Sequence, residues 1–250
     1  MYAVCAEFIK LKRSMSWVVV VLLPVVLVLA GSLMTLIDGN RLEDGWHTVW
    51  LRSFVFYGLF PLPVGIAILA SLVWRVEHRG SNWNALGAGP TSSLRIVVSK
   101  TAAVTVLATA MQLIAVATVI LIGVFAFGLS GFPPLRYFVA TVMIIAAAMP
   151  VAAFQSFLSM WMRSFAGPVL IAFLAACASS LMLVAEFDPV VFFSPYATLT
   201  RATQLGTATF ADAGTITGPV LASIAVASII LTAAAIAVGA VRLERGEIRT

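Results

Sequence analysis

The chain has 250 residues, of which 62% are hydrophobic and only 10% are charged, and its formal net charge is +5. A soluble domain carries about 45–50% apolar and about 25% charged residues, so a soluble core cannot absorb this much apolar surface, whereas lipid can. No polar linker, repeat or low-complexity stretch divides the sequence. The composition excludes an ordinary soluble protein and predicts one all-α integral membrane domain over residues 1–250.

The first sixteen residues, 1–16, form an amphipathic segment. Apolar side chains recur at helical spacing on one face, and polar or basic side chains lie on another or nearby. The apolar set is Val4, Phe8, Leu11 and Met15, and the polar set is Glu7, Lys10, Lys12, Arg13 and Ser14. We expect an interfacial helix at the inner membrane surface. A simple positively charged anchor is the alternative.

Six apolar windows follow, and each is long enough to cross a bilayer, which takes about 20 predominantly apolar residues. They are approximately Trp17–Ile37, Phe54–Trp74, Ala102–Leu129, Leu135–Met162, Phe165–Val184 and Gly218–Val241. The first window continues to Ile37, which is longer than the apolar region of a signal peptide and favours a membrane span. The sequence therefore predicts six transmembrane helices.

Basic residues outside the windows orient the chain. With the N-terminus inside, eleven lie on the cytoplasmic side and four on the outer side, which places both termini in the cytoplasm. The four outer residues are Arg41, Arg52, Arg136 and Arg201. The positive net charge is thus explained by membrane orientation, and we expect no nucleic-acid site.

No window needs an ionisable residue near its centre, although ion-driven carriers usually keep one there. His47 and His78 fall on opposite sides of the membrane, so they cannot form a metal site together. We expect no catalytic residue and no metal. Five residues in the third and fourth windows are candidates for a substrate path, and interhelical hydrogen bonding or kinking is the alternative for each. They are Gln112, Pro150, Gln155, Ser156 and Ser159.

The cytoplasmic segment 75–100, between the second and third windows, is too polar for a membrane and too long for a tight turn. Thr91-Ser92-Ser93 can cap a following helix. A short helix with apolar knobs, ended by glycines and proline, suits docking into a groove on another protein, whereas an ordinary loop is the alternative. The candidate docking residues are Glu77, Trp83, Asn84, Leu86 and Pro90.

The outer segment 185–217 is longer than a minimal connection. Ser194-Pro195 is a good helix start, and Tyr196, Leu199 and Leu205 predict a short interfacial helix. It could be a re-entrant or interface-lying cover for the bundle, or act as an outer gate or a site that meets an amphipathic peptide leaving the membrane.

Two stretches resemble the permease subunits of ABC-2-type exporters, and most of all the branch that protects bacteria from lantibiotics and bacitracin-like peptides. One is Glu7–Ser14 running into Trp17, with Pro24 in the first window. The other combines Glu77, Trp83, Leu86, Pro90 and Lys100, and looks like that family's glutamate–proline–lysine segment. Gly87-Ala88-Gly89 departs from the bulkier apolar residues that the family more often has before the proline.

The resemblance implies a six-span, type V exporter fold in the bacterial cytoplasmic membrane. Residues 75–100 would hold a coupling helix that seats on a separate ATPase dimer, and residues 1–16 would form the interfacial helix. A phosphate-cradling G-x-x-x-x-G-K-[ST] loop does not occur in the sequence. ATP and magnesium are therefore expected in the partner subunits, and this chain is not expected to be an enzyme.

The function expected from the sequence is export of a hydrophobic or amphipathic compound, such as an antimicrobial peptide. A second permease copy, or a related permease, is expected to complete the membrane part. A sensor or scaffold of an antimicrobial-stress response is the main alternative. A lipid-modifying enzyme and a channel have less support, since paired carboxylates and histidine clusters are missing from the windows.

Overall fold

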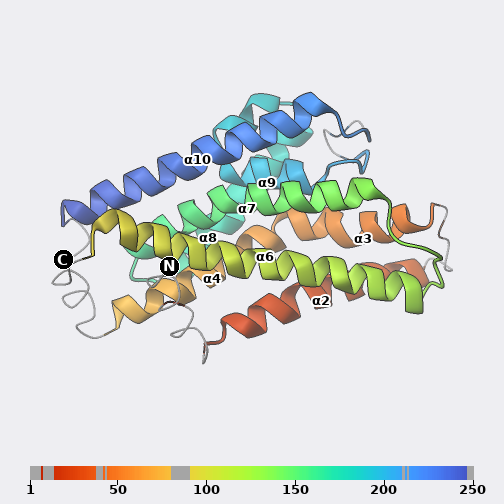
Figure 1. Ribbon diagram of the computed structural model, residues 1–250, viewed down its shortest axis with the longest axis horizontal. Coiled ribbons are helices and arrows are strands. Elements are labelled where there is room, and N and C mark those ends of the chain that lie inside the picture. Colours follow the sequence, from red (N-terminus) through yellow and green to blue (C-terminus); the bar gives the residue numbers. More distant parts are fainter. Residues whose placement is uncertain are drawn as a thin grey trace.

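The computed structural model describes residues 7, 14–37, 42, 44–79, 91–209, 212 and 214–246. The regular structure of these residues is helical, and its long helices run roughly along the long axis of the molecule (Figure 1). The elements are α2 (Ser16–Ile37), α3 (Trp46–Leu59), α4 (Pro61–His78), α6 (Ser93–Phe125), α7 (Leu135–Trp161), α8 (Ala166–Val184), the 3₁₀ helix η1 (Asp188–Phe192), α9 (Pro195–Thr203) and α10 (Gly218–Glu244).

Five of these helices, α2, α6, α7, α8 and α10, are long and apolar enough to cross a membrane. A bent pair, α3 and α4, brings the number to six if it counts as one span. The all-α, multi-pass architecture predicted from composition is therefore confirmed for the described part of the chain. The side chains that α2, α8 and α10 expose include many large apolar ones, such as Leu22, Leu174 and Ile229, as expected for helices whose outer surface contacts acyl chains.

The second window, Phe54–Trp74, was predicted as one continuous span, and this prediction is wrong. The chain breaks at Phe60, and α3 and α4 meet at an angle of 50°. Pro61 and Pro63 lack backbone N–H groups, and a residue that precedes proline is disfavoured in the α region. Phe60 accordingly leaves helical geometry, with φ −142° and ψ −28°. Pro61 then suits the first position of α4.

Helix α7 is the centre of the bundle, since α10, α4, α6 and α9 all pack against it. Small side chains at its contacts, including Ala140, Ala147 and Ala152, are almost fully buried and let neighbouring backbones approach closely. The helix continues through Pro150 without interruption. Two small residues of α8, Ala172 and Ala176, are also fully buried.

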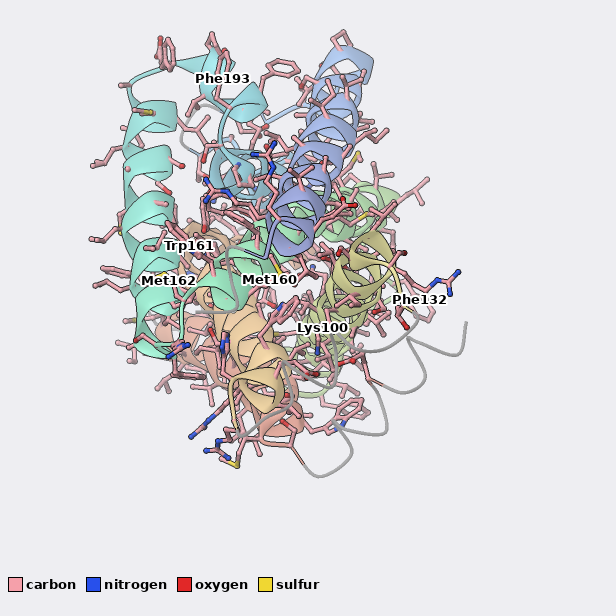
Figure 2. All side chains as sticks on the ribbon, turned by 90° about the vertical axis from the view of Figure 1, so that its left-hand side faces the viewer. Lys100, Phe132, Met160, Trp161, Met162 and Phe193 are labelled. Carbon is pink, nitrogen blue, oxygen red and sulfur yellow. The ribbon has the colours of Figure 1, made fainter. Side chains whose placement is uncertain are left out.

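The outer segment holds α9, which begins where the sequence predicts. The Ser194 hydroxyl accepts a hydrogen bond from the Ala197 N–H at 3.4 Å. The prediction that this helix lies at the membrane interface is wrong, because Tyr196, Leu199 and Leu205 are all buried. It packs against α7, α8 and α3, whereas Phe193 stays exposed at the edge of the molecule between α8 and α10 (Figure 2).

Candidate coupling site

Both ends of segment 75–100 are helical. Helix α4 continues to His78, and α6 begins at Ser93. The predicted cap is present, because the Ser92 hydroxyl accepts a hydrogen bond from the Arg95 N–H at 3.4 Å. Lys100 therefore lies two turns inside the helix that these capping residues predicted. Residues 80–90 lie outside the described residues.

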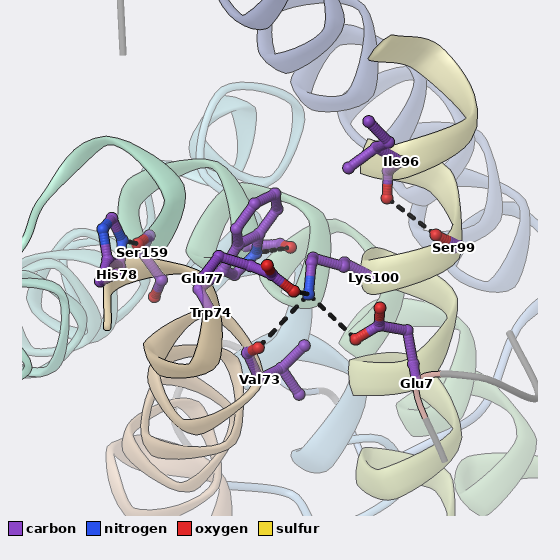
Figure 3. Close-up of polar contacts among 10 residues, drawn as sticks. Glu7, Val73, Trp74, Glu77, His78, Ile96, Ser99, Lys100 and Ser159 are labelled. Atoms are coloured by element: carbon purple, nitrogen blue, oxygen red, sulfur yellow. Dashed lines mark hydrogen bonds and ion pairs between the residues drawn. The ribbon is translucent and has the colours of Figure 1, made fainter. Parts of the chain in front are cut away.

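Lys100 forms the centre of a buried charge cluster made with Glu7 and Glu77. Its Nζ lies 2.9 Å from Glu7 Oε2 and 3.0 Å from Glu77 Oε1 (Figure 3). It also donates to the Val73 carbonyl at 3.4 Å. These acceptors account for all three donors of an ammonium group. The Trp74 ring centroid lies 4.9 Å from Nζ, within cation–π range.

The cluster is closed to solvent. The relative exposure of Lys100 is 1%, that of Glu77 is 3% and that of Glu7 is 7%. Withdrawing charges from water costs several kcal/mol per ion, and only close, well-bonded partners offset that cost. The three charges therefore hold three parts of the chain together: the N-terminal segment, the end of α4 and the start of α6.

Hydrogen bonds extend this cluster into α7. The indole Nε1 of Trp74 donates to the Ser156 hydroxyl at 2.7 Å. His78 Nε2 lies 2.7 Å from the Ser159 carbonyl oxygen, as the donor in this pair, and the hydroxyls of Ser71 and Ser159 are 3.2 Å apart. The end of α4 is thus fixed to the C-terminal half of the central helix by polar contacts.

Also on α7, the buried Gln155 side chain donates a hydrogen bond from Nε2 to the Tyr196 hydroxyl on α9. Gln155 directly precedes Ser156, which receives the Trp74 bond. One stretch of α7 therefore contacts α4 on one side and the interior helix α9 on another. This continuous set of contacts joins the charge cluster to the outer segment.

Replacing Tyr196 with phenylalanine is expected to destabilise the protein by about 0.6–1.7 kcal/mol, the range measured for hydrogen bonds between membrane helices. A double-mutant cycle with Gln155→Leu, followed by equilibrium unfolding in mixed micelles, measures the coupling. Phe138→Leu, on the exposed face of the same helix, is the control, because it trims a ring that lies more than four turns from Gln155. Additive effects of the two substitutions would show that the bond contributes nothing.

The structure brings together two of the residues predicted from sequence, Glu7 and Glu77, which were assigned to separate elements. Eight others lie outside the described residues: Trp83, Asn84, Leu86, Pro90, Phe8, Lys10, Lys12 and Arg13. Glu7 was placed on the polar face of an interfacial helix, but its carboxylate is buried. Lys100 was quoted in the family resemblance without a proposed role. The helix cap at Ser92, eight residues earlier, is the sequence signal that places it inside a helix.

The five candidates for a substrate path occupy different surroundings. Pro150 lines a cavity of about 450 Å³ beside Phe193 and Tyr196, and Ser159 lines one of about 210 Å³. Gln155 and Ser156 are engaged between helices, and Gln112 is buried with no hydrogen-bond partner among the described residues. Their role in transport stays a prediction. Within the described residues, no three His, Cys, Asp or Glu side chains are grouped to hold a metal ion.

Comparison with known protein families assigns this chain to a family. The family of ABC-2 family transporter proteins matches residues 3–179, well over half of the chain, and this range contains Glu7, Glu77 and Lys100. The chain belongs to the ABC-2 transporter family. Searches of curated proteins and of solved structures gave no match. As an ABC-2 membrane protein it is a permease subunit, and such subunits work with an ABC ATPase.

Proposed function

We propose that this ABC-2 permease subunit is the membrane part of an exporter in the bacterial cytoplasmic membrane, with both termini in the cytoplasm. It expels a hydrophobic or amphipathic compound, such as a lantibiotic or bacitracin-type peptide. Two ATPase subunits bind below it, and a second copy or a related permease completes the membrane part. The buried charge cluster is the element that transmits ATPase closure to the membrane helices.

The observation that carries this proposal is the position of Lys100. Its ion pair with Glu77 joins the two helical ends of segment 75–100, which are the end of α4 and the first turns of α6. Neither end can therefore move without the other. A partner that displaces the residues between them therefore moves α4 and α6 together. The bond from Trp74 to Ser156 carries this movement to α7. Glu77 acts inside the protein, while Trp83 and Leu86 remain the proposed contacts with the ATPase.

The test separates docking from transmission. Affinity purification of the wild-type chain from its own membranes is expected to recover an ATPase with a P-loop. Trp83→Ala with Leu86→Ala is expected to lose most of that ATPase, by about tenfold or more, because the loss of two apolar anchors costs several kcal/mol. Recovery is measured by quantitative mass spectrometry of the purified complex.

Glu77→Gln is expected to keep the ATPase bound but to reduce protection against a panel of lantibiotic and bacitracin-type peptides. Glu244→Gln is the control, because it neutralises an exposed acid at the end of α10 without touching the cluster. Protection is measured as the inhibitory peptide concentration. Wild-type chain that recovers no P-loop ATPase would contradict the exporter assignment. Full protection with Glu77→Gln would contradict the transmission role.

A further inference from the structure

The cavity of about 210 Å³ that contains Ser159 lies at the end of the bundle where α4 and α7 end and α8 begins. Two arginines line it, Arg75 of α4 and Arg163 of the connection between α7 and α8, together with His78. Among the described residues, no Asp or Glu side chain belongs to this lining. Glu77, the acid next to His78 in sequence, is buried in the charge cluster. The lining of this cavity, called the basic cavity below, is therefore positively charged.

The donor groups of the basic cavity are accessible. Arg75, Arg163 and Ser164 all line it, and all three are exposed residues. The Ser164 hydroxyl accepts a hydrogen bond from the Gly167 N–H at 3.2 Å, so its own O–H is able to donate to a ligand. A guanidinium presents a fork of donors that matches the oxygens of a phosphate group. The cavity thus offers several accessible donors to an oxyanion.

The floor of the basic cavity is held in place by hydrogen bonds between α4 and α7. His78 Nε2 donates to the Ser159 carbonyl at 2.7 Å, and the hydroxyls of Ser71 and Ser159 are 3.2 Å apart (Figure 3). Arg75 lies one turn after Ser71, and Arg163 follows Ser159 by four residues. Both arginines therefore extend from a fixed frame, and a site formed in advance binds a ligand at a lower cost in ordering.

Aromatic side chains place the basic cavity at the level of lipid head groups. Trp161 is 55% exposed at the end of α7, and Phe165, which lines the cavity, is 42% exposed. The Arg75 guanidinium carbon lies 6.0 Å from the centre of the Phe165 ring. Exposed aromatic rings at the ends of membrane helices lie at the boundary between acyl chains and water, which is also where lipid phosphates lie.

The size of the basic cavity suits a head group better than part of a partner protein. One turn of helix, about 5.4 Å long and about 10 Å wide, needs roughly 400 Å³. The cavity provides about 210 Å³, which is enough for a phosphate and the atoms attached to it.

We propose that the basic cavity binds the phosphate of one anionic phospholipid of the surrounding membrane. Arg75 and Arg163 contact the phosphate, and the Ser164 hydroxyl donates to it. The acyl chains lie along exposed apolar side chains of α8, such as Leu170 and Leu174. Basic pockets between membrane helices bind head groups in this way. The site requires only that the chain is embedded in a bilayer, and it is independent of the proposed export function.

The test uses native mass spectrometry of the purified full-length chain with added phosphatidylglycerol or phosphatidylcholine of identical acyl chains. Phosphatidylglycerol is expected to be retained roughly tenfold more tightly, because basic residues near the phosphates favour anionic lipid. Arg75→Gln with Arg163→Gln is expected to remove this preference. Arg95→Gln with Arg245→Gln is the matched control and should keep it, since it removes two exposed positive charges at the same end of the bundle but outside the cavity (Figure 1).

A pair of substitutions at Ser164 tests the site without removing the bond to Gly167. Aspartate and asparagine both accept such hydrogen bonds at the start of a helix. Ser164→Asp adds a carboxylate to the cavity and is expected to abolish the preference, whereas Ser164→Asn should keep it. Equal retention of the two lipids by the wild-type chain, or a wild-type preference in Ser164→Asp or in the double arginine variant, would overturn the proposal.

A last arm identifies the source of the anion. Soluble glycerol 1-phosphate is expected to leave lipid retention unchanged, because it lacks the acyl chains that hold the lipid beside α8. Displacement of phosphatidylglycerol by this compound would assign the cavity to a soluble phosphate instead. A double arginine variant that keeps the lipid preference but loses a co-purified protein would assign the cavity to a protein partner, which also contradicts the proposal.

Discussion

Replacing Lys100 with methionine is expected to lower the free energy of unfolding by about 3–5 kcal/mol, the cost of breaking a buried ion pair by removing one partner. Methionine keeps most of the side-chain length but leaves the Glu7 and Glu77 carboxylates buried without their shared cation. It also removes the donor to the Val73 carbonyl. Equilibrium unfolding of the purified protein in mixed micelles measures the loss.

A matched control and a rescue make this prediction specific. Arg95→Met removes a positive charge from the exposed face of α6, five residues before Lys100, and should change stability by less than about 0.5 kcal/mol. Replacing Glu7, Glu77 and Lys100 together with methionine should recover most of the loss, because an apolar substitute for a whole buried cluster is often neutral. A Lys100→Met protein as stable as the Arg95→Met protein would show that the cluster contributes little.

Replacing Gly58 with alanine is expected to destabilise the protein by about 1–3 kcal/mol, as other overpacked interiors do. A Cβ atom at this position would overlap the side chain of Thr203. Thr203 is fully buried on α9, and its hydroxyl donates to the Thr200 carbonyl at 2.8 Å, so it has little freedom to move. The close contact between α3 and α9 therefore requires a residue without a side chain at position 58.

The compensating variant tests this explanation. Gly58→Ala with Thr203→Gly exchanges which helix carries the Cβ atom, and it should recover part of the stability lost by Gly58→Ala. Gly128→Ala is a poor control because its φ is positive, whereas Gly218→Ala is suitable, since a Cβ atom there meets nothing within 4 Å. Thermal unfolding, followed by tryptophan fluorescence, measures the stability of the single variant, the compensating double variant and the Gly218→Ala control. A Gly58→Ala protein with wild-type stability would show that α9 shifts at no cost.

Apolar composition and window length predict most of the helices, because lipid requires long apolar helices whatever their partners. The break at Phe60 escapes such windows, since Pro61 and Pro63 interrupt the backbone without lowering the apolar content. For α9 the sequence predicts where the helix begins but not where it lies in the protein. Its start at Ser194 follows from local capping chemistry, but its threonines suggest a surface helix. Burial of Thr198 and Thr203 is tolerated because their hydroxyls bond to nearby carbonyls, as Thr198 does to Val191 at 2.7 Å, whereas the buried Thr200 hydroxyl has no partner among the described residues.

The charge cluster could not be predicted as a unit. Lys100 is separated from Glu77 by 23 residues and from Glu7 by 93, and no periodic pattern relates them. Positive-inside reasoning places all three on one side of the membrane, but it treats each as a surface charge. Which charges leave water is decided by how α4 and α6 pack, and that depends on the whole bundle.

Burial of α9 has a consequence for biosynthesis. This helix fills the space between α3, α7 and α8, yet it leaves the ribosome after all three of them. Chains generally fold from the N-terminus during synthesis. The earlier helices α3, α7 and α8 are therefore in the bilayer before α9 is available to pack against them. A nascent chain that ends after α8 lacks this interior helix, so the bundle can pack completely only once α9 has been synthesised.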